Sequence, residues 1–263
     1  MFQEITSKNN DQLKYLRKLS SKSFRDAESA FIIEGTKLFL EAVKNKLPFK
    51  QVFVTNEWLE INTGAISDYL ITLAEKNVTV AIVNPAILSS VSSLQKPEGI
   101  ICILPKITVP PGTFKRYVLL EDVQDPYNVG TIIRTADAAG FDCVVTSTKT
   151  ADVYNEKVLR GSMGSVFHLP IYQVESLLDY VQQLKDQSIT IIGTSLMGSS
   201  LWEREPLNGS FAIVMGNESK GMSDDMSECC DRLLKIPILG QAESLNVATA
   251  AGIIMYDLVR DFK

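Results

Sequence analysis

The chain is poor in histidine and cysteine, the side chains that bind zinc. Its 263 residues include one histidine, His168, and four cysteines, Cys102, Cys143, Cys229 and Cys230. A single histidine excludes a zinc site built on several histidines, and the adjacent pair Cys229-Cys230 does not have the spacing of metal ligands. The cysteines show no disulfide framework either, which predicts reduced thiols in a cytoplasmic protein. We therefore expect no bound metal.

Several common functional motifs are also missing. No apolar window of about eighteen residues occurs, which predicts no membrane-spanning helix, and the N-terminus does not have the apolar core of a signal peptide. The sequence contains no phosphate-binding P-loop, no Gly-x-Gly-x-x-Gly and no Gly-x-Ser-x-Gly. A Ser-His-Asp hydrolase would need His168 as its base, but the apolar sequence Val-Phe-His-Leu-Pro favours a core or surface histidine.

Positive charge is concentrated at one end of an acidic chain. The net charge is −5, yet residues 1–105 balance at +1 while residues 106–263 balance at −6. A local basic stripe is what phosphate contacts require, whatever the global sum. An ordinary solvated helix face explains the same residues, so charge alone leaves both interpretations open. The candidate RNA-binding side chains are Lys8, Lys14, Arg17, Lys18, Lys22 and Arg25.

Alternating apolar and amphipathic segments predict an α/β protein of two domains. The proline-rich stretch over residues 106–114 favours an extended linker between a small α/β domain, residues 1–105, and a second domain, residues 115–263. The strands of the second domain are apolar enough for a mostly parallel sheet covered on both faces. Expected strands are 31–33, 51–55, 78–83, 99–104, 117–121, 143–146, 168–172, 190–193, 211–215 and 233–237. Expected helices are 11–20, 36–45, 65–76, 129–139, 156–161, 175–185 and 244–262.

The first of three unusual segments of the second domain is Asn128-Val-Gly-Thr-Ile-Ile-Arg134-Thr-Ala-Asp-Ala-Ala-Gly140. Asn128 is a good N-cap for the following helix, and Gly140 is a good residue to end it. The immediate neighbours of Arg134 are small or apolar, so a purely structural role explains this arginine poorly. Its guanidinium suits a phosphate or a carboxylate. Considered alone, the segment is still more simply explained as a capped helix.

The second and third segments place polar residues after predicted strands. Gly216-Asn-Glu218-Ser-Lys-Gly221 follows an apolar run, and its two glycines allow a close backbone approach to a ligand. The other segment contains Gly240, then Ser244-Leu-Asn246 at the start of a helix, where Ser244 is an ordinary N-cap. Each segment alone could be a turn. Three strand-end loops in one domain favour a binding site, because ligands of open α/β sheets lie at that edge.

In this order, the three segments resemble the signature motifs of the SpoU (TrmH) family of RNA ribose 2′-O-methyltransferases, in the SPOUT superfamily. Gly161-Ser-Met-Gly164 and Phe167-His-Leu-Pro170 are also similar to that family. The stretch Phe31-Ile-Ile-Glu-Gly35, followed by Val52-Phe-Val-Thr55, resembles the N-terminal substrate-binding domain of its members. The resemblance covers about 140 residues of the second domain in addition to this N-terminal region.

The resemblance implies a fold and a site that composition does not show. It implies a sheet whose C-terminal segment forms a trefoil knot, a homodimer with both protomers contributing to each active site, and S-adenosylmethionine bound in the knot. Carried over by motif, the cofactor-binding residues are Thr194, Gly216, Ile236 and Leu245. The resemblance makes Arg134 the central catalytic candidate, with Asn128, Glu218 and Asn246 shaping the pocket.

The implied reaction is attack of a ribose 2′-hydroxyl on the sulfonium methyl group. Because arginine stays protonated in water, Arg134 is a poor general base. Our hypothesis is that it binds a phosphate and favours the alkoxide electrostatically, while Glu218 orients it. The preferred substrate is large-subunit 23S ribosomal RNA, by analogy at the level of domain organisation. The alternatives are a transfer-RNA methyltransferase, a silent RNA-binding module of the same fold and a small-molecule methyltransferase.

Overall fold

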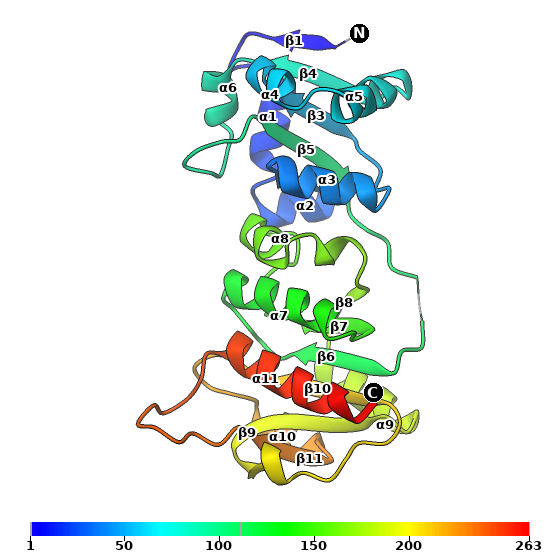
Figure 1. Cartoon of the computed structure of the whole chain (residues 1–263), viewed down its shortest axis with the longest axis vertical. Coiled ribbons are helices and arrows are strands. Elements are labelled where there is room, and N and C mark those ends of the chain that lie inside the picture. Colours follow the sequence, from blue (N-terminus) through cyan, green and yellow to red (C-terminus); the bar gives the residue numbers. More distant parts are fainter. Residues whose placement is uncertain (1, 111, 263) are drawn as a thin grey trace. The chain divides into compact units, whose positions relative to one another are not determined.

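The computed structural model describes residues 2–110 and 112–262, which divide into two compact units (Figure 1). The first unit comprises Met1–Thr108 together with Tyr154–Leu159, and the second comprises Val109–Val153 together with Arg160–Lys263. The division after Thr108 falls within the proline-rich segment 106–114. The presence of residues 154–159 in the first unit has no signal in the sequence. Its physical basis is Tyr154, whose ring packs on Phe31 at a centroid distance of 4.6 Å.

The first unit is built on a mixed five-stranded sheet in the order β1-β4-β3-β5-β2. Strands β1, β4 and β3 are parallel, and β5 runs antiparallel to both of its neighbours, β3 and β2. Leu13 and Leu16 of α1 are buried in the core of this sheet, together with Leu19, which follows the helix directly. The bounds are β1 Gln3–Ile5, α1 Asp11–Lys18, α2 Lys22–Glu28, β2 Ala30–Glu34, α3 Thr36–Lys44, β3 Gln51–Val54, α4 Asn56–Ile61, α5 Ala65–Glu75, β4 Thr79–Val83, α6 Pro85–Ser89 and β5 Ile100–Pro105.

The second unit contains a six-stranded sheet in the order β11-β9-β10-β6-β7-β8, in which every neighbouring pair is parallel. This confirms the predicted mostly parallel sheet. The bounds are β6 Arg116–Leu120, α7 Pro126–Ala138, β7 Cys143–Ser147, α8 Glu156–Ser162, β8 Ile171–Val174, α9 Leu177–Asp186, β9 Thr190–Ser200, β10 Phe211–Met215, α10 Asp224–Cys229, β11 Arg232–Lys235 and α11 Val247–Val259. Short 3₁₀ turns are η1 Ser165–Phe167, η2 Leu201–Glu203 and η3 Arg260–Phe262.

Both faces of this sheet are buried. Alternate strand residues such as Leu119, Val145 and Ile191 pack in one cluster with α9 and with Met226 of α10. The intervening residues, including Val118, are also buried, as expected for a parallel sheet covered on both sides. Helix α11 packs against α7, which brings the first and the last long helices of the unit together.

The pairing between β9 and β11 is interrupted in the middle of β9. The register jumps between Leu233, opposite Gly193, and Leu234, opposite Ser199. Residues 194–198 of β9 are therefore left without partners in β11, and this excursion projects from the sheet. At Gly198 a Cβ atom would lie 2.6 Å from the carbonyl carbon of Leu233, so only glycine allows the two backbones this close.

Several predicted boundaries are wrong. The expected strand 168–172 begins only at Ile171, because His168 follows the 3₁₀ turn η1 and is partly exposed. The expected C-terminal helix 244–262 begins at Val247. The short elements β1, α2, α4, α6 and α10 were not predicted, since segments of three to seven residues carry too little hydrophobic periodicity.

Candidate functional site

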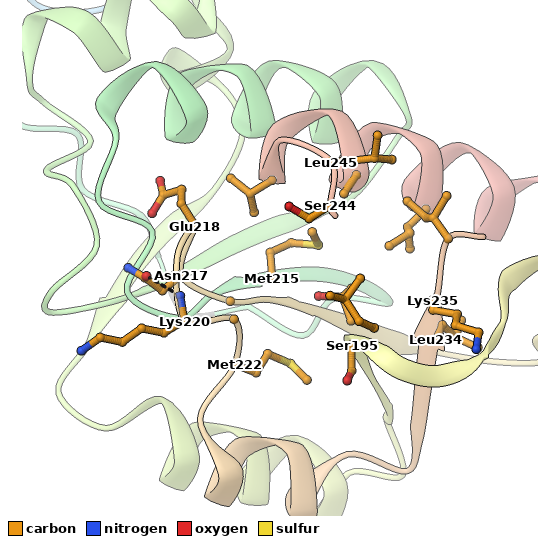
Figure 2. Close-up of a pocket in the computed structure, with 18 of the residues that line it drawn as sticks. Ser195, Met215, Asn217, Glu218, Lys220, Met222, Leu234, Lys235, Ser244 and Leu245 are labelled. Atoms are coloured by element: carbon orange, nitrogen blue, oxygen red, sulfur yellow. Dashed lines mark hydrogen bonds between the residues drawn. The ribbon is translucent and has the colours of Figure 1, made fainter. Parts of the chain in front are cut away.

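The second unit contains a cavity of about 480 Å³ where its strand-end loops converge. This volume falls in the range of small-molecule sites. Figure 2 shows Ser244 and Leu245 on one side of it and Ser195 on the other, while the side chain of Lys220 points away. Most of the lining residues come from three stretches of chain: Thr194, Ser195 and Leu196; Met215 to Met222; and Leu234 to Ile254 with gaps; Ser227 of α10 adds to them.

The four predicted cofactor residues all line this one cavity. Thr194 comes from the excursion of β9, Gly216 follows β10, Ile236 follows β11, and Leu245 precedes α11. The hydroxyl of Thr194 donates to the Val214 carbonyl at 2.9 Å, which ties the excursion to the central strand β10.

The turn after β10 requires glycine. A Cβ atom on Gly216 would lie 2.3 Å from the carbonyl carbon of Gly221, a distance that no side chain can occupy. The side chain of Asn217 fills the turn, since its Oδ1 accepts from the backbone N–H groups of Ser219 and Lys220. Its Nδ2 donates to the carbonyl of Asp122 at 2.8 Å. The turn is thus fixed internally and tied to the loop that precedes α7.

Glu218 extends from the same turn to the start of α7. Its carboxylate accepts from the backbone N–H groups of Gln124 and Asp125, at 3.1 and 2.9 Å, and from Asn128 Nδ2 at 3.1 Å. Burial raises the pKa of this carboxyl, but the hydrogen bonds from Asp125, Asn128 and Gln124 outweigh that effect and leave the pKa below its ordinary value. Glu218 therefore lies next to the N-terminus of α7 as a charged acceptor.

Asn128 and Asn246 continue this hydrogen-bonded chain. Asn246 Nδ2 donates to Asn128 Oδ1 at 2.9 Å. Asn246 Oδ1 in turn accepts from the backbone N–H groups of Ala248 and Thr249 and so caps α11. One continuous sequence of contacts, from Glu218 through Asn128 to Asn246, joins all three motif segments.

Two predicted N-caps are corrected by this geometry. Helix α7 begins at Pro126 and is capped by Asp125, whose Oδ1 accepts from Tyr127 N at 2.8 Å. Asn128 is inside the helix and buried, where its amide forms tertiary contacts instead. Ser244 lies in the loop two residues before the cap of α11, which is Asn246.

Arg134 is separate from this chain of contacts. It is exposed on α7, its side chain forms no hydrogen bond or ion pair with the residues that the structure describes, and it does not line the cavity. The hypothesis that Glu218 orients Arg134 directly is wrong, because the carboxylate contacts the first turn of α7 instead. The effect of Glu218 on Arg134 is to fix the helix that carries it.

The basic residues of the first unit fall into two groups. Lys8, Lys14, Lys18 and Lys22 are exposed, and Arg17 is half-buried with contacts to Lys8 O and Ser90 Oγ. Arg25 is buried, and its guanidinium donates to the carbonyls of Leu19 and Ser20 at 2.8 and 2.7 Å. The expectation of Arg25 as a surface phosphate contact is wrong, because it stabilises the turn between α1 and α2.

Some lining residues were not predicted. Ser195, Leu196, Met222 and Glu243 line the cavity without a motif that singles them out. Glu243 and Leu196 are exposed, and only proximity in the sequence to Thr194 and Leu245 could have suggested them. Within the described part of the chain, no three His, Cys, Asp or Glu residues form a group that could hold a metal ion. No helix there is long and apolar enough to cross a membrane.

The cavity fits S-adenosylmethionine by its chemistry. Apolar side chains such as Ile236 and Leu245 suit an adenine ring, and Gly216 contributes backbone to the same lining. Serine hydroxyls and the carboxylate of Glu243 are available to its polar groups. A parallel α/β unit with this site at its strand ends belongs to the class of S-adenosylmethionine-dependent methyltransferases.

Comparison with known proteins identifies the family. Residues 115–256 match the SpoU rRNA Methylase family, and residues 10–102 match the MRM3-like substrate binding domain. The chain belongs to the SpoU rRNA methylase family, and its methyl donor is S-adenosylmethionine. It is 37% identical to the 23S rRNA (guanosine(2553)-2′-O)-methyltransferase RlmP of Bacillus subtilis, over 97% of this chain and 98% of that protein.

Solved structures show the same fold over the full length. An rRNA methyltransferase from Sinorhizobium meliloti with bound S-adenosylmethionine is similar, with a TM-score of 0.87 and 28% identity over 100% of this chain and 99% of that one. The SpoU methyltransferase AviRb from Streptomyces viridochromogenes, also with S-adenosylmethionine, gives a TM-score of 0.81 and 25% identity over 96% and 99% of the two chains.

Proposed function

We propose that this protein transfers the methyl group of S-adenosylmethionine to a ribose 2′-hydroxyl of 23S ribosomal RNA. The Bacillus subtilis relative, which matches nearly the whole of both chains, acts by its name on guanosine 2553 of that RNA. Both the methylase domain and the region that matches a substrate-binding domain are thus shared in one continuous alignment. The guanosine equivalent to that nucleotide is the proposed target.

The cavity is the proposed cofactor site, with Thr194, Gly216, Ile236 and Leu245 as its binding residues. The observation that carries this proposal is that all four converge on one cavity, although they come from three separate segments of the second unit: β9, the turn after β10 and the loop between β11 and α11. When bound there, S-adenosylmethionine supplies an electrophilic methyl group on a positively charged sulfur. The 2′-oxygen of the RNA ribose forms the new bond to that methyl group as the bond from sulfur to methyl breaks, the neutral thioether S-adenosylhomocysteine would be the leaving group, and the 2′-hydroxyl proton would be released to water.

Arg134 is the proposed catalytic residue. Its guanidinium is exposed and has no partner among the described residues, so its donors are available to the phosphate beside the reacting ribose. Positive charge at that position favours the developing negative charge on the 2′-oxygen. Arginine cannot serve as the proton acceptor because it stays protonated.

Asn128, Glu218 and Asn246 act in this proposal by positioning. Their polar atoms are already engaged with one another and with the backbone at the starts of α7 and α11. They hold the helix of Arg134 in register with the loops that line the cofactor cavity. A variant that breaks this chain should therefore affect both cofactor binding and turnover.

A trefoil knot and a homodimer complete the proposal. The support for the knot is that the loop from 236 to 246 lines the same cavity as the excursion of β9 and the turn after β10. Arg134 does not line the cavity of its own chain, which supports a site completed by the Arg134 of a second copy. Tyr127 of α7 and Tyr256 of α11, 55% and 54% exposed on two helices that pack together, offer apolar area for such a contact.

The first unit is proposed to hold the RNA. Lys8, Lys14, Lys18 and Lys22 present exposed ammonium groups, although Lys14 also pairs with Asp11 at 2.8 Å. Phosphate contacts of this kind add affinity without sequence selectivity. Replacing Lys18 and Lys22 by glutamine should weaken RNA binding and make it less dependent on salt, without a change in affinity for S-adenosylmethionine.

The test of the proposed function is a map of ribose methylation in total RNA from cells with and without the gene. We expect one 2′-O-methylguanosine of 23S rRNA to disappear, and to return when purified protein and S-adenosylmethionine are added. Loss of a transfer-RNA site with unchanged ribosomal RNA would establish the transfer-RNA alternative. RNA binding with little affinity for S-adenosylmethionine and no turnover would indicate the silent RNA-binding module.

A further inference from the structure

A carboxylate lies one helical turn after the proposed catalytic arginine and is held by residues from another segment. Asp137 follows Arg134 by three positions on α7. Its Oδ2 accepts a hydrogen bond from Ser165 Oγ at 2.8 Å and lies 3.0 Å from His168 Nε2. Ser165 begins the 3₁₀ turn η1 and His168 follows it directly. His168, the single histidine of the chain, therefore lies beside α7.

Asp137 contacts Ser165 and His168 and does not pair with Arg134. Residues three apart on a helix are surface neighbours, and an arginine and an aspartate at that spacing attract each other. Yet Arg134 forms no ion pair with any residue that the structure describes, while the Asp137 carboxylate is directed to Ser165 and His168. An Arg134–Asp137 ion pair would occupy the donors that a phosphate needs.

The fold holds Ser165 and His168 in place. Ser165 is buried, with 6% of its surface exposed, and the turn begins at Gly164, whose φ of +98° favours glycine. His168 is 43% and Asp137 33% exposed at the side chain. Ser165 is thus a fixed donor that holds Oδ2, and His168 is a second, more accessible donor to the same oxygen.

We propose that Ser165 and His168 are positioning residues for RNA binding, which hold the Asp137 carboxylate away from Arg134 and so keep its guanidinium free for a phosphate. The proposal rests on the proposed function of Arg134 as the phosphate-binding residue. It assigns to residues 164–168 a role that does not involve contact with either substrate. A competing ion pair on an exposed helix surface is weak, so its effect on RNA affinity should be a few-fold.

The test compares four forms of the full-length protein: the wild type, Ser165→Ala/His168→Phe, the same double variant with Asp137→Ala, and Asp137→Ala alone. The affinity for a 23S rRNA transcript and the KM and kcat for methylation are measured in low salt. The affinity for S-adenosylmethionine controls for the fold of the cavity. We expect the double variant to bind RNA about 2–5-fold more weakly with kcat little changed. Addition of Asp137→Ala should restore wild-type RNA affinity.

A positioning role and a purely structural role predict different orders of RNA affinity among the variants. If Ser165, His168 and Asp137 only stabilise the turn, Asp137→Ala alone should be as harmful as the loss of the donors, and it should not restore the double variant. That outcome, or wild-type RNA affinity in the double variant, overturns the proposal. If the double variant does not fold, wild-type RNA affinity of Asp137→Ala alone still supports it, and weakened affinity overturns it.

RNA binding is measured apart from turnover, so failure of this proposal is distinguishable from failure of the proposed function. Absence of methylation in every form, with the expected order of RNA affinities, would contradict the methyltransferase proposal only. Methylation by the wild type with no difference among the variants in KM or RNA affinity would contradict only the role of Ser165 and His168.

Discussion

Asn128 and Glu218 are separated by 90 residues in the sequence and joined by a hydrogen bond of 3.1 Å between Asn128 Nδ2 and Glu218 Oε1. The bond joins the first turn of α7 to the turn that follows β10 and begins with Gly216. Asn246 Nδ2 donates to the oxygen of the same Asn128 amide. Asn128 therefore uses both of its polar groups to connect two loops that are remote in the sequence.

We expect this pair to be energetically coupled. Glu218→Gln removes the charge that three hydrogen bonds favour, and we expect it to lower the free energy of unfolding by about 1 kcal/mol, a modest value because the residue is exposed to solvent. Asn128→Ala should cost more, because Asn128 is buried. A double-mutant cycle from chemical denaturation measures the coupling. Strictly additive effects would show that the two residues act independently.

Asn246 offers a way to separate stability from catalysis. Asn246→Ala removes the cap of α11 and should cost about 1 kcal/mol. Asn246→Asp keeps the oxygen that caps the helix but loses the amide donor to Asn128. We expect the aspartate variant to unfold at nearly the wild-type temperature and to show reduced turnover, measured by transfer of labelled methyl groups. Wild-type turnover in the aspartate variant would mean that capping is the sole role of Asn246.

Arg134 should affect turnover and leave stability unchanged. The side chain is exposed and has no partner among the described residues, so Arg134→Lys should change the free energy of unfolding by less than about 0.5 kcal/mol. Lysine keeps the charge but not the planar pair of donors, and we expect kcat/KM for RNA to fall by roughly tenfold to a hundredfold. The affinity for S-adenosylmethionine, from calorimetry, should not change. Near-normal turnover would show that charge suffices and that bidentate geometry is not used.

Gly216, which lines the cavity, and Gly240, in the loop before α11 and outside the lining, form a matched pair. A Cβ atom on Gly216 would overlap the backbone of Gly221, whereas a Cβ atom on Gly240 would meet nothing within 4 Å. Gly216→Ala should displace the turn at a cost of about 1–3 kcal/mol and weaken S-adenosylmethionine binding at least about tenfold, which corresponds to ~1.4 kcal/mol. Gly240→Ala should bind the cofactor as the wild type does. Equal affinities in the two variants would argue against the cavity as the cofactor site.

Acid should weaken the anchor at the end of α11. Arg204 is almost fully buried between Asp257 and Asp261, with Nε 2.6 Å from the former and Nη1 2.5 Å from the latter. Burial raises the pKa of Asp261, but the hydrogen bond from Arg204 prevails and leaves that pKa below its ordinary value of 3.8. The stabilisation is therefore complete above the ordinary value and is lost as the pH falls through the lower folded-state pKa.

Arg204→Met tests this dependence. At neutral pH it leaves two carboxylates without their buried partner, and we expect a loss of about 3–5 kcal/mol. The difference in unfolding free energy between the variant and the wild type should shrink as the pH is lowered below 3.8. A difference that stays constant down to the acid transition would show that packing of the arginine, and not its charge, provides the stabilisation.

Local sequence was sufficient for the features that depend on neighbours along the chain. The apolar strands determined a parallel sheet, and the small neighbours of Arg134 marked it as a residue without a structural task. Gly216 and Gly221 marked a turn where backbones meet, because only glycine fits there. The start of α7 could also have been found, since Asp125-Pro126 is a strong N-terminal signal.

Features that depend on remote partners were decided by the tertiary structure. Ser244 and Asn246 are both good N-caps, and Asn246 is the one whose amide also meets Asn128. Arg25 lies in a basic stretch like its neighbours, but its guanidinium is buried and donates to two backbone carbonyls. Likewise, nothing local indicates that Asp137 faces Ser165 and His168. The sequence by itself determined the longer elements and the motif residues. The tertiary structure decided which of those residues hold one another and which, like Arg134, are left free to meet a substrate, because hydrogen bonds between distant segments form only when the chain has folded.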